Sequence, residues 1–227
     1  MNTAHITSYF KKEIHLDGRA LDVFRPVEIE QGISRTAEGS ARVKIGGTEV
    51  LAGIKMLMGA PFPDTPDEVT IMVNVELLEV SNPEFEPGPP GIQAIELARV
   101  IDRCIRESKV IDLHKLCVKK GEKCWSVSVD ICTINDEGNL LDASALATVA
   151  ALKDTQFPLY ENDAVDYSQK TTKTLPFTKD LPISITVSKI GDHFVVDPLL
   201  VEEKVVDARL TCGVMLDENK LCSLQKG

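Results

Sequence analysis

The chain has 227 residues, of which 43% are hydrophobic and 26% are charged, and its formal net charge is −10. This balance is typical of a folded globular protein and excludes a disordered chain, and no apolar run reaches the roughly 20 residues that cross a bilayer. So acidic a chain is also a poor autonomous binder of nucleic acid, because phosphate backbones are held mainly by lysine and arginine.

Targeting signals and cysteine usage both favour a reducing compartment. Residues 1–12 lack the basic and then apolar pattern of a secretory signal, so we expect a cytoplasmic protein with no membrane contact. The six cysteines include no C-x-x-C pair, and none lies at zinc-ligand spacing from a histidine. We therefore expect reduced core cysteines, no disulfide, and no metal or other cofactor.

The first half of the chain predicts a hairpin, a strand and a helix. Two β runs flank a Gly-Gly turn within residues 41–57, and residues 70–80 alternate as a half-buried strand does. Residues 81–91 hold four prolines and two glycines, which predicts a loop. Residues 92–108 then show the periodicity of an amphipathic helix.

One face of the predicted helix carries arginines. At about 100° per residue, Arg99, Arg103 and Arg106 fall within roughly 60° of one another, opposite an apolar arc. Asp102 and Arg106 are spaced as an i,i+4 ion pair. Helix geometry alone therefore favours a solvated, salt-bridged face.

The second half predicts another strand, a helix and a return to β structure. Residues 123–134 are predicted to be a strand that is followed by a turn. Residues 142–152 are alanine-rich and predict a helix whose N-cap is Asp142 or a near neighbour. Residues 183–197 and 208–224 each predict a pair of β runs. The sequence thus predicts an α+β protein with helices packed on sheets.

Residues 15–55 resemble the opening of the RNase PH family. The family pattern is D-G-R, R-P, A-x-G-S and G-x-T-x-V-L in that order. Here it reads HLDGRALDVFRP followed by GISRTAEGSARVKIGGTEVLAGIK. Residues 73–108 and 138–152 resemble more narrowly the non-catalytic ring subunit of the archaeal exosome, and the resemblance extends over about residues 14–227.

The resemblance implies the fold and its limits. It implies an RNase PH-like fold of two pseudo-symmetric βαβ-type halves with a ribosomal-protein-like topology, forming a single domain over residues 1–227. The first 14 or so residues are expected to be an N-terminal extension. Relatives continue into a C-terminal helix packed on the sheet, whereas this sequence ends at Gly227. We therefore expect either a shortened chain or an apolar sheet surface left for another element.

The position of the family's phosphate cradle has lost its chemistry. In active relatives the cradle resembles G-G-S/T-R at the start of a helix. Backbone N–H groups, a hydroxyl and an arginine converge there on an anion. The aligned residues here are Gly138, Asn139, Leu140 and Leu141. Asp142 follows, and its carboxylate is expected to occupy the N–H donors and repel phosphate.

The family's acidic cluster is partly retained. In active relatives the sequence at this position resembles D-L-D-Y-x-E-D. Here Asp197 matches the first acid, Glu203 replaces the last, and Leu199 replaces the middle one. A carboxylate pair can still bind a metal ion. An active phosphorolytic 3′-to-5′ exoribonuclease using Asp197 and Glu203 is therefore the alternative function, while an acidic solvated turn is the simpler interpretation.

The resemblance implies a non-catalytic subunit of a hexameric 3′-to-5′ RNA-degrading exosome ring. Its partners would be a catalytic RNase PH-like subunit, RNA-binding cap subunits, and single-stranded RNA passing through the assembled ring. Arg99 and Arg103 are the implied RNA-binding residues beside the partner's active site, and Arg35 is a weaker candidate. A purely structural protein of the same fold, without RNA contact, is a third hypothesis.

Overall fold

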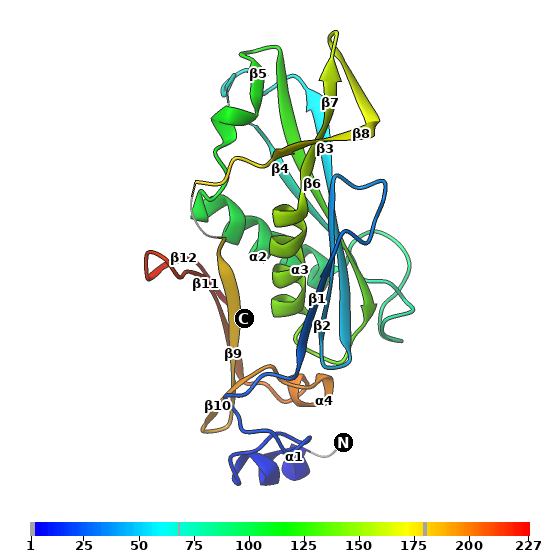
Figure 1. Ribbon diagram of the computed structural model, residues 1–227. Coiled ribbons are helices and arrows are strands. Elements are labelled where there is room, and N and C mark those ends of the chain that lie inside the picture. Colours follow the sequence, from blue (N-terminus) through cyan, green and yellow to red (C-terminus); the bar gives the residue numbers. More distant parts are fainter. Residues whose placement is uncertain (1–2, 68, 179–180) are drawn as a thin grey trace.

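A computed structural model describes residues 3–67, 69–178 and 181–227 of the chain. Two long helices, α2 (Ile92–Ser108) and α3 (Leu140–Asp154), lie between a large and a small β-sheet (Figure 1). The large sheet contacts both helices from one side, and strands of the small sheet contact them from the other.

The large sheet has the strand order β1-β2-β3-β6-β4, with β5 paired to β6. Its strands are β1 (Val27–Gln31), β2 (Gly39–Ile45), β3 (Thr48–Gly59), β4 (Ile71–Glu76), β5 (Cys117–Lys119) and β6 (Lys123–Asn135). All neighbours pair antiparallel except β4 and β6, which are parallel and are connected through α2. The first half therefore contains one βαβ unit.

The helices bury the faces that the sequence pattern assigns to the core. The predicted apolar arc of α2 is buried throughout, and it consists of Ala94, Leu97, Val100, Ile101, Cys104 and Ile105. The helix ends at Lys109, which adopts the left-handed conformation as its C-cap. Helix α3 packs so closely on β2 that a Cβ atom at Gly39 would lie 2.4 Å from the carbonyl oxygen of Ala151. Only glycine fits there.

The small sheet is antiparallel, with the order β10-β9-β11-β12. Its strands are β9 (Ile183–Ile190), β10 (His193–Val196), β11 (Ala208–Met215) and β12 (Lys220–Lys226). The face toward α3 carries hydroxyl groups, for Thr186 and Thr211 are buried there and hydrogen-bond to each other. Large apolar side chains of the same strands are exposed, namely Ile183, Ile185, Leu210, Leu221 and Leu224. These side chains form an exposed apolar surface on the small sheet.

Shorter elements complete the chain: α1 (Thr3–Phe10), η1 (Leu113–Leu116), β7 (Gln156–Glu161), β8 (Ala164–Thr174) and α4 (Leu200–Glu203). The predicted N-terminal extension packs against the rest of the protein. Ile6 and Phe10 of α1 are buried in a small cluster with Ile190 and Val195 at the end of the small sheet. Residues 1 and 2 of that extension lie outside the described residues.

The structure confirms the hairpin, the strand after residue 70, the loop over residues 81–91, both helices and the two late β pairs. The strand β4 ends at Glu76, before the predicted residue 80, and α3 extends two residues beyond its predicted range at each end. Local sequence patterns did not indicate α1, β1, α4 or the separate β7–β8 hairpin. Within the described ranges, no helix is long and apolar enough to span a membrane.

Candidate functional site

The backbone N–H groups of the loop that leads into α3 form hydrogen bonds within the protein. The three successive N–H groups of residues 137–139 donate to Thr48 Oγ1 (3.1 Å), Asp136 Oδ1 (3.0 Å) and Glu203 Oε1 (2.7 Å), respectively. A backbone anion cradle needs such N–H groups unpaired and convergent on the ligand. These three donors are therefore not available to a phosphate.

Arg25 holds the carbonyl side of the same loop. Its Nη1 donates to the carbonyl oxygen of Glu137 at 3.0 Å, and its Nη2 donates to that of Gly138 at 3.1 Å. Nη2 also donates to Oδ1 of Asp197 at 2.7 Å. A planar guanidinium with a fixed fork of donors thus ties the loop to the strand end that carries Asp197.

Both oxygens of the Asp197 carboxylate accept hydrogen bonds from the protein. It is fully buried and adopts a positive φ of 49°. Oδ1 accepts from Arg25 and Asn139, and Oδ2 accepts from the backbone and side chain of Arg25 and from Arg19. Burial raises the pKa of this carboxyl, but the hydrogen bonds and charge of Arg25 outweigh it and lower the pKa below its usual value. Asp197 is therefore an ionised anchor.

The prediction about Asp142 is wrong in its geometry. Its carboxylate does not occupy the N–H donors at the helix start. Instead Oδ1 accepts from the hydroxyl of Thr186 at 2.8 Å, and Oδ2 accepts from the Thr186 backbone at 3.2 Å. The N-cap position is occupied by Asn139 in the left-handed conformation. Burial raises the pKa of Asp142 to about 6 against the opposing hydrogen bonds from Thr186.

Glu203 is the carboxylate that reaches the loop before α3. It accepts the Asn139 N–H, and it lines a cavity beside the helix start. Burial and the nearby charge of Asp136 raise the pKa of Glu203 to about 7, although the Asn139 hydrogen bond opposes the shift. The predicted pair of Asp197 and Glu203 is therefore split into a low-pKa and a high-pKa carboxyl.

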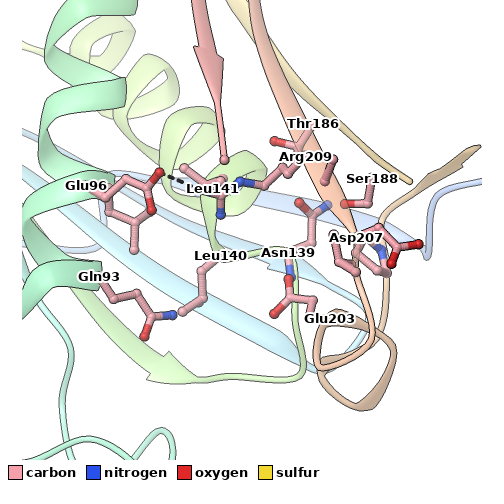
Figure 2. A pocket seen from close by; sticks show the side chains of 15 residues that line it. Gln93, Glu96, Asn139, Leu140, Leu141, Thr186, Ser188, Glu203, Asp207 and Arg209 are labelled. Carbon is pink, nitrogen blue, oxygen red and sulfur yellow. Dashed lines mark hydrogen bonds and ion pairs between the residues drawn. The ribbon is translucent and has the colours of Figure 1, made fainter. Parts of the chain in front are cut away.

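The cavity beside the start of α3 has a volume of about 360 Å³ (Figure 2). Three carboxylates line it, from Glu96, Glu203 and Asp207, together with one guanidinium, from Arg209. Arg209 Nη2 lies 2.5 Å from Oε1 of Glu96, so its charge is already offset. The side chains at the helix start that would hold a phosphate are leucines. An excess of negative charge in a half-enclosed space repels a phosphate anion.

The outer face of α2 presents cations with few internal partners. Arg99 is exposed and makes no ion pair or hydrogen bond within residues 3–67, 69–178 and 181–227. Arg103 is also exposed, and its one polar contact is a long one of 3.5 Å to Oε1 of Gln225. Arg106 differs, because it pairs with Asp102 at 2.6 Å and donates to the carbonyl oxygen of Ile71. The three predicted arginines thus separate into two available and one engaged.

Arg35 and the lysines around the β5–β6 turn are less suited to hold RNA beside Arg99 and Arg103. The lysines around the β5–β6 turn are ion-paired, as Lys115 with Asp112, Lys119 with Glu122, Lys120 with Asp67 and Lys123 with Asp163. Arg35 is exposed in the loop before β2 and lies on a different element from the arginines of α2. In the described part of the chain, no three His, Cys, Asp or Glu residues are grouped to hold a metal ion.

The structure also shows what the residues of the recognisable motifs contact. The arginine of R-P is Arg25, which holds loop 137–139. The threonine of G-x-T-x-V-L is Thr48, whose hydroxyl donates to the Gly138 carbonyl at 2.6 Å. The arginine of D-G-R is Arg19, which reaches Asp197 at 3.1 Å. Arg25 and Thr48 thus contact the loop itself, and Arg19 contacts Asp197, which Arg25 ties to that loop. The motifs therefore carried a structural signal beyond the family resemblance for which they were used.

The chain is similar in sequence to known proteins over most of its length. Residues 23–158 match domain 1 of the 3′ exoribonuclease family, RNase PH, and residues 180–227 match domain 2 of that family. The chain is 45% identical over 214 residues to the exosome complex component Rrp42 of Methanopyrus kandleri, covering 93% of this chain and 79% of the relative. It is 46% identical over 224 residues to that of Archaeoglobus fulgidus, covering 98% and 84%.

Solved structures agree. A chain of the Archaeoglobus fulgidus exosome with RNA bound to the active site superposes with a TM-score of 0.90 at 45% identity, covering 99% of this chain and 86% of that one. A chain of an archaeal exosome core gives 0.86 at 43% identity, covering 99% and 84%. Rice Rrp46, at 20% identity and a TM-score of 0.68, shares the fold alone, with 93% and 84% covered. The predicted α+β, RNase PH-like fold is confirmed.

Proposed function

The chain belongs to the 3′ exoribonuclease family, and we propose that it is a non-catalytic subunit of a cytoplasmic, hexameric exosome ring that degrades RNA from the 3′ end. The observation that supports this most directly is the loop before α3. Its three N–H donors are used internally, and its cavity is lined by carboxylates. A phosphorolytic enzyme must seat inorganic phosphate at this position, and here the N–H donors of residues 137–139 are occupied and carboxylates outnumber the one guanidinium.

Within the ring, Arg99 and Arg103 hold the RNA backbone. They lie four residues apart, so both guanidinium groups project from one face of α2, and neither has a strong internal partner. Such groups grip phosphates without reading bases, which suits an enzyme that degrades RNA of any sequence. They serve the active site of the neighbouring catalytic subunit.

The net negative charge of the chain makes RNA binding depend on the catalytic partner subunit. With a net charge of −10, the chain alone attracts RNA weakly, so the catalytic RNase PH-like subunit supplies the phosphate cradle and the acids. RNA-binding cap subunits complete the assembly. The two family regions act as one domain in this arrangement, because α2 and α3 serve both sheets as a shared core.

RNA affinity of the assembled ring tests the arginines. The full chain is mixed with a catalytic RNase PH-like subunit, and the mass of the complex must correspond to a hexamer of two alternating chains. The double variant Arg99→Ala, Arg103→Ala is expected to lower the ring's affinity for single-stranded RNA roughly tenfold to a hundredfold. The slope of log affinity against log salt should shrink by about 1.4, because two phosphate contacts are lost.

Arg106→Ala is the matched control, since it removes a guanidinium from the same helix face that is already engaged by Asp102. It should leave both affinity and salt slope nearly unchanged. Unchanged RNA binding in the double variant would instead support a purely structural subunit. The chain alone, given RNA and phosphate, should release no nucleoside diphosphates, and release would support the alternative, an active exoribonuclease using Asp197 and Glu203.

A further inference from the structure

Two of the six cysteines face each other across the β5–β6 hairpin. Cys117 and Cys124 are directly opposite residues in the antiparallel register of these strands. Their Sγ atoms lie 2.6 Å apart, whereas the S–S bond of a disulfide measures about 2.05 Å. Both residues are free thiols in the structure. The two sulfur atoms are therefore already close to bonding distance.

The backbone permits the bond. Opposite residues of an antiparallel pair have Cα atoms about 4.5–5.5 Å apart, and disulfides accept Cα separations of roughly 4.4–6.8 Å. The turn between the strands is tight, for Glu122 N donates to the carbonyl oxygen of Lys119 at 3.0 Å. Closing the bond thus needs a side-chain adjustment and no rearrangement of the sheet.

A second pair of cysteines is a poorer candidate. Cys222 Sγ donates to the carbonyl oxygen of Cys104 at 3.7 Å, and Cys104 is buried under the small sheet. Cys104 lies on α2 and Cys222 on β12, so these two residues are not opposite each other on paired strands. Cys117 is also half-exposed, so an outside reagent can reach it.

We propose that Cys117 and Cys124 form a reversible disulfide that fixes the β5–β6 hairpin when the protein meets a small-molecule disulfide. The Cys117 thiolate attacks one sulfur of the reagent, breaks its S–S bond and releases one thiolate. Cys124, after losing its proton to solvent, attacks Cys117 Sγ and releases the second thiolate. Two protein thiols are oxidised to one disulfide, and the reagent is reduced to two thiols.

The order of attack follows from accessibility. Cys124 is only 4% exposed, and burial raises the pKa of its thiol to about 12, so it cannot start the reaction efficiently. Once Cys117 carries the mixed disulfide, the adjacent Cys124 competes from within the molecule, where its effective concentration is high. Exchange should therefore be slow at neutral pH and faster in alkaline buffer.

The disulfide would add to contacts that already hold the β5–β6 hairpin against neighbouring loops. Near the hairpin tip Gly121 N donates to the carbonyl oxygen of Pro66 at 2.7 Å, and Lys120 pairs with Asp67 at 3.0 Å. At the same end of the hairpin Lys123, the first residue of β6, pairs with Asp163 of the β7–β8 turn. A covalent link across the strands would therefore restrict one end of the large sheet.

Mass spectrometry of the full chain tests the proposal. Native protein is treated with oxidised glutathione, blocked with iodoacetamide and digested with trypsin, which cleaves after the lysines that flank both cysteines. The expected product joins fragments 116–119 and 124–153 with the loss of two hydrogen atoms. Reduction with dithiothreitol should separate them. A glutathione adduct on Cys117 without any joined product would overturn the proposal, as would complete absence of reaction at Cys117.

Fragment 124–153 also holds Cys132, so variants assign the partner. Cys132→Ser should keep the joined product, and Cys124→Ser should abolish it and leave the Cys117 adduct. Joined fragments in the Cys124→Ser protein would show that another cysteine pairs, which contradicts the assignment. Fragmentation of the joined wild-type product between residues 124 and 132 in the mass spectrometer assigns the partner as well, so the test does not depend on how well either variant folds.

Discussion

Arg25 and Asp197 form a buried ion pair in which Nη2 and Oδ1 lie 2.7 Å apart, although 172 residues separate them in the chain. The backbone N–H of Arg25 donates to the same carboxylate at 2.8 Å. The pair joins the loop before α3 to the end of β10. It therefore explains why an acid survives at position 197 in a chain that we propose to be non-catalytic.

Replacing Asp197 should cost stability, and the RNA-degrading rate of a folded ring should not change. Asp197→Asn leaves the guanidinium of Arg25 buried without its counter-charge, a change that typically destabilises by roughly 3–5 kcal/mol. Denaturant unfolding of the chain measures this loss. The exposed Asp192→Asn is the control and should stay within about 0.5 kcal/mol of wild type. Unchanged stability together with a ring that has lost turnover would show that Asp197 acts in catalysis.

The hydroxyl of Thr48 should contribute to the same loop. It is fully buried, donates to the Gly138 carbonyl at 2.6 Å and accepts from the Glu137 N–H at 3.1 Å. Thr48→Val keeps the shape but leaves the Glu137 N–H unpaired, while the Gly138 carbonyl keeps its hydrogen bond from Arg25, so the variant should lose about 1–3 kcal/mol in unfolding free energy. Thr172→Val, on the exposed strand β8, should change it by less than about 0.5 kcal/mol. Equal effects at both sites would mean that the loop does not depend on Thr48.

Gly138 should be irreplaceable for two separable reasons. Its φ is +95°, and a Cβ atom there would lie 2.5 Å from the carbonyl oxygen of Pro198 and 2.6 Å from the backbone nitrogen of Leu200. Gly191 also has a positive φ, of +61°, but has open space around it. Gly191→Ala should therefore cost about 1 kcal/mol from backbone strain alone. Gly138→Ala should cost at least about 3 kcal/mol, because backbone atoms cannot move aside. A smaller loss at Gly138 than at Gly191 would contradict this packing.

Local periodicity predicted most of the regular structure. The buried arc of α2, the hairpin around Gly46 and Gly47 and the late β pairs follow from signals within a dozen residues of each other. The pattern of α3 was also clear, but its start was not. The prediction placed Asp142 near the cap, whereas the helix begins two residues earlier behind Asn139.

Side-chain partners distant in sequence were not predictable in this way. Nothing local indicates that Glu203 rather than Asp142 accepts an N–H of the loop before α3. His15 carried no site signal, yet it is buried with Nδ1 2.8 Å from Oε2 of Glu202, 187 residues away. Such pairs depend on how the two sheets close on the shared helices, which is a property of tertiary packing. The separation of Arg106 from Arg99 likewise required the position of Asp102 and Ile71 in space.

The raised pKa of Glu203 predicts an unusual pH dependence of stability. Burial, the largest cause, and Asp136 raise the pKa of this carboxyl in the folded chain to about 7, above its usual value of 4.5. The folded protein therefore binds more protons than the unfolded chain between about pH 4.5 and pH 7. Since stability falls with pH wherever the folded state holds more protons, Glu203 makes the protein less stable as pH rises through this window.

Glu203→Gln should remove this effect, because the amide keeps an acceptor for the Asn139 N–H but cannot ionise. We expect the unfolding free energy of the variant to exceed that of wild type by about 2 kcal/mol more at pH 8 than at pH 5, as measured by urea unfolding at both values. Asp142, whose pKa is also raised, is present in both proteins and cancels in the comparison. The exposed Glu86→Gln should show no such difference between the two pH values. If Glu203→Gln behaves like Glu86→Gln, the carboxyl ionises normally and the cavity beside α3 is better solvated than its lining indicates.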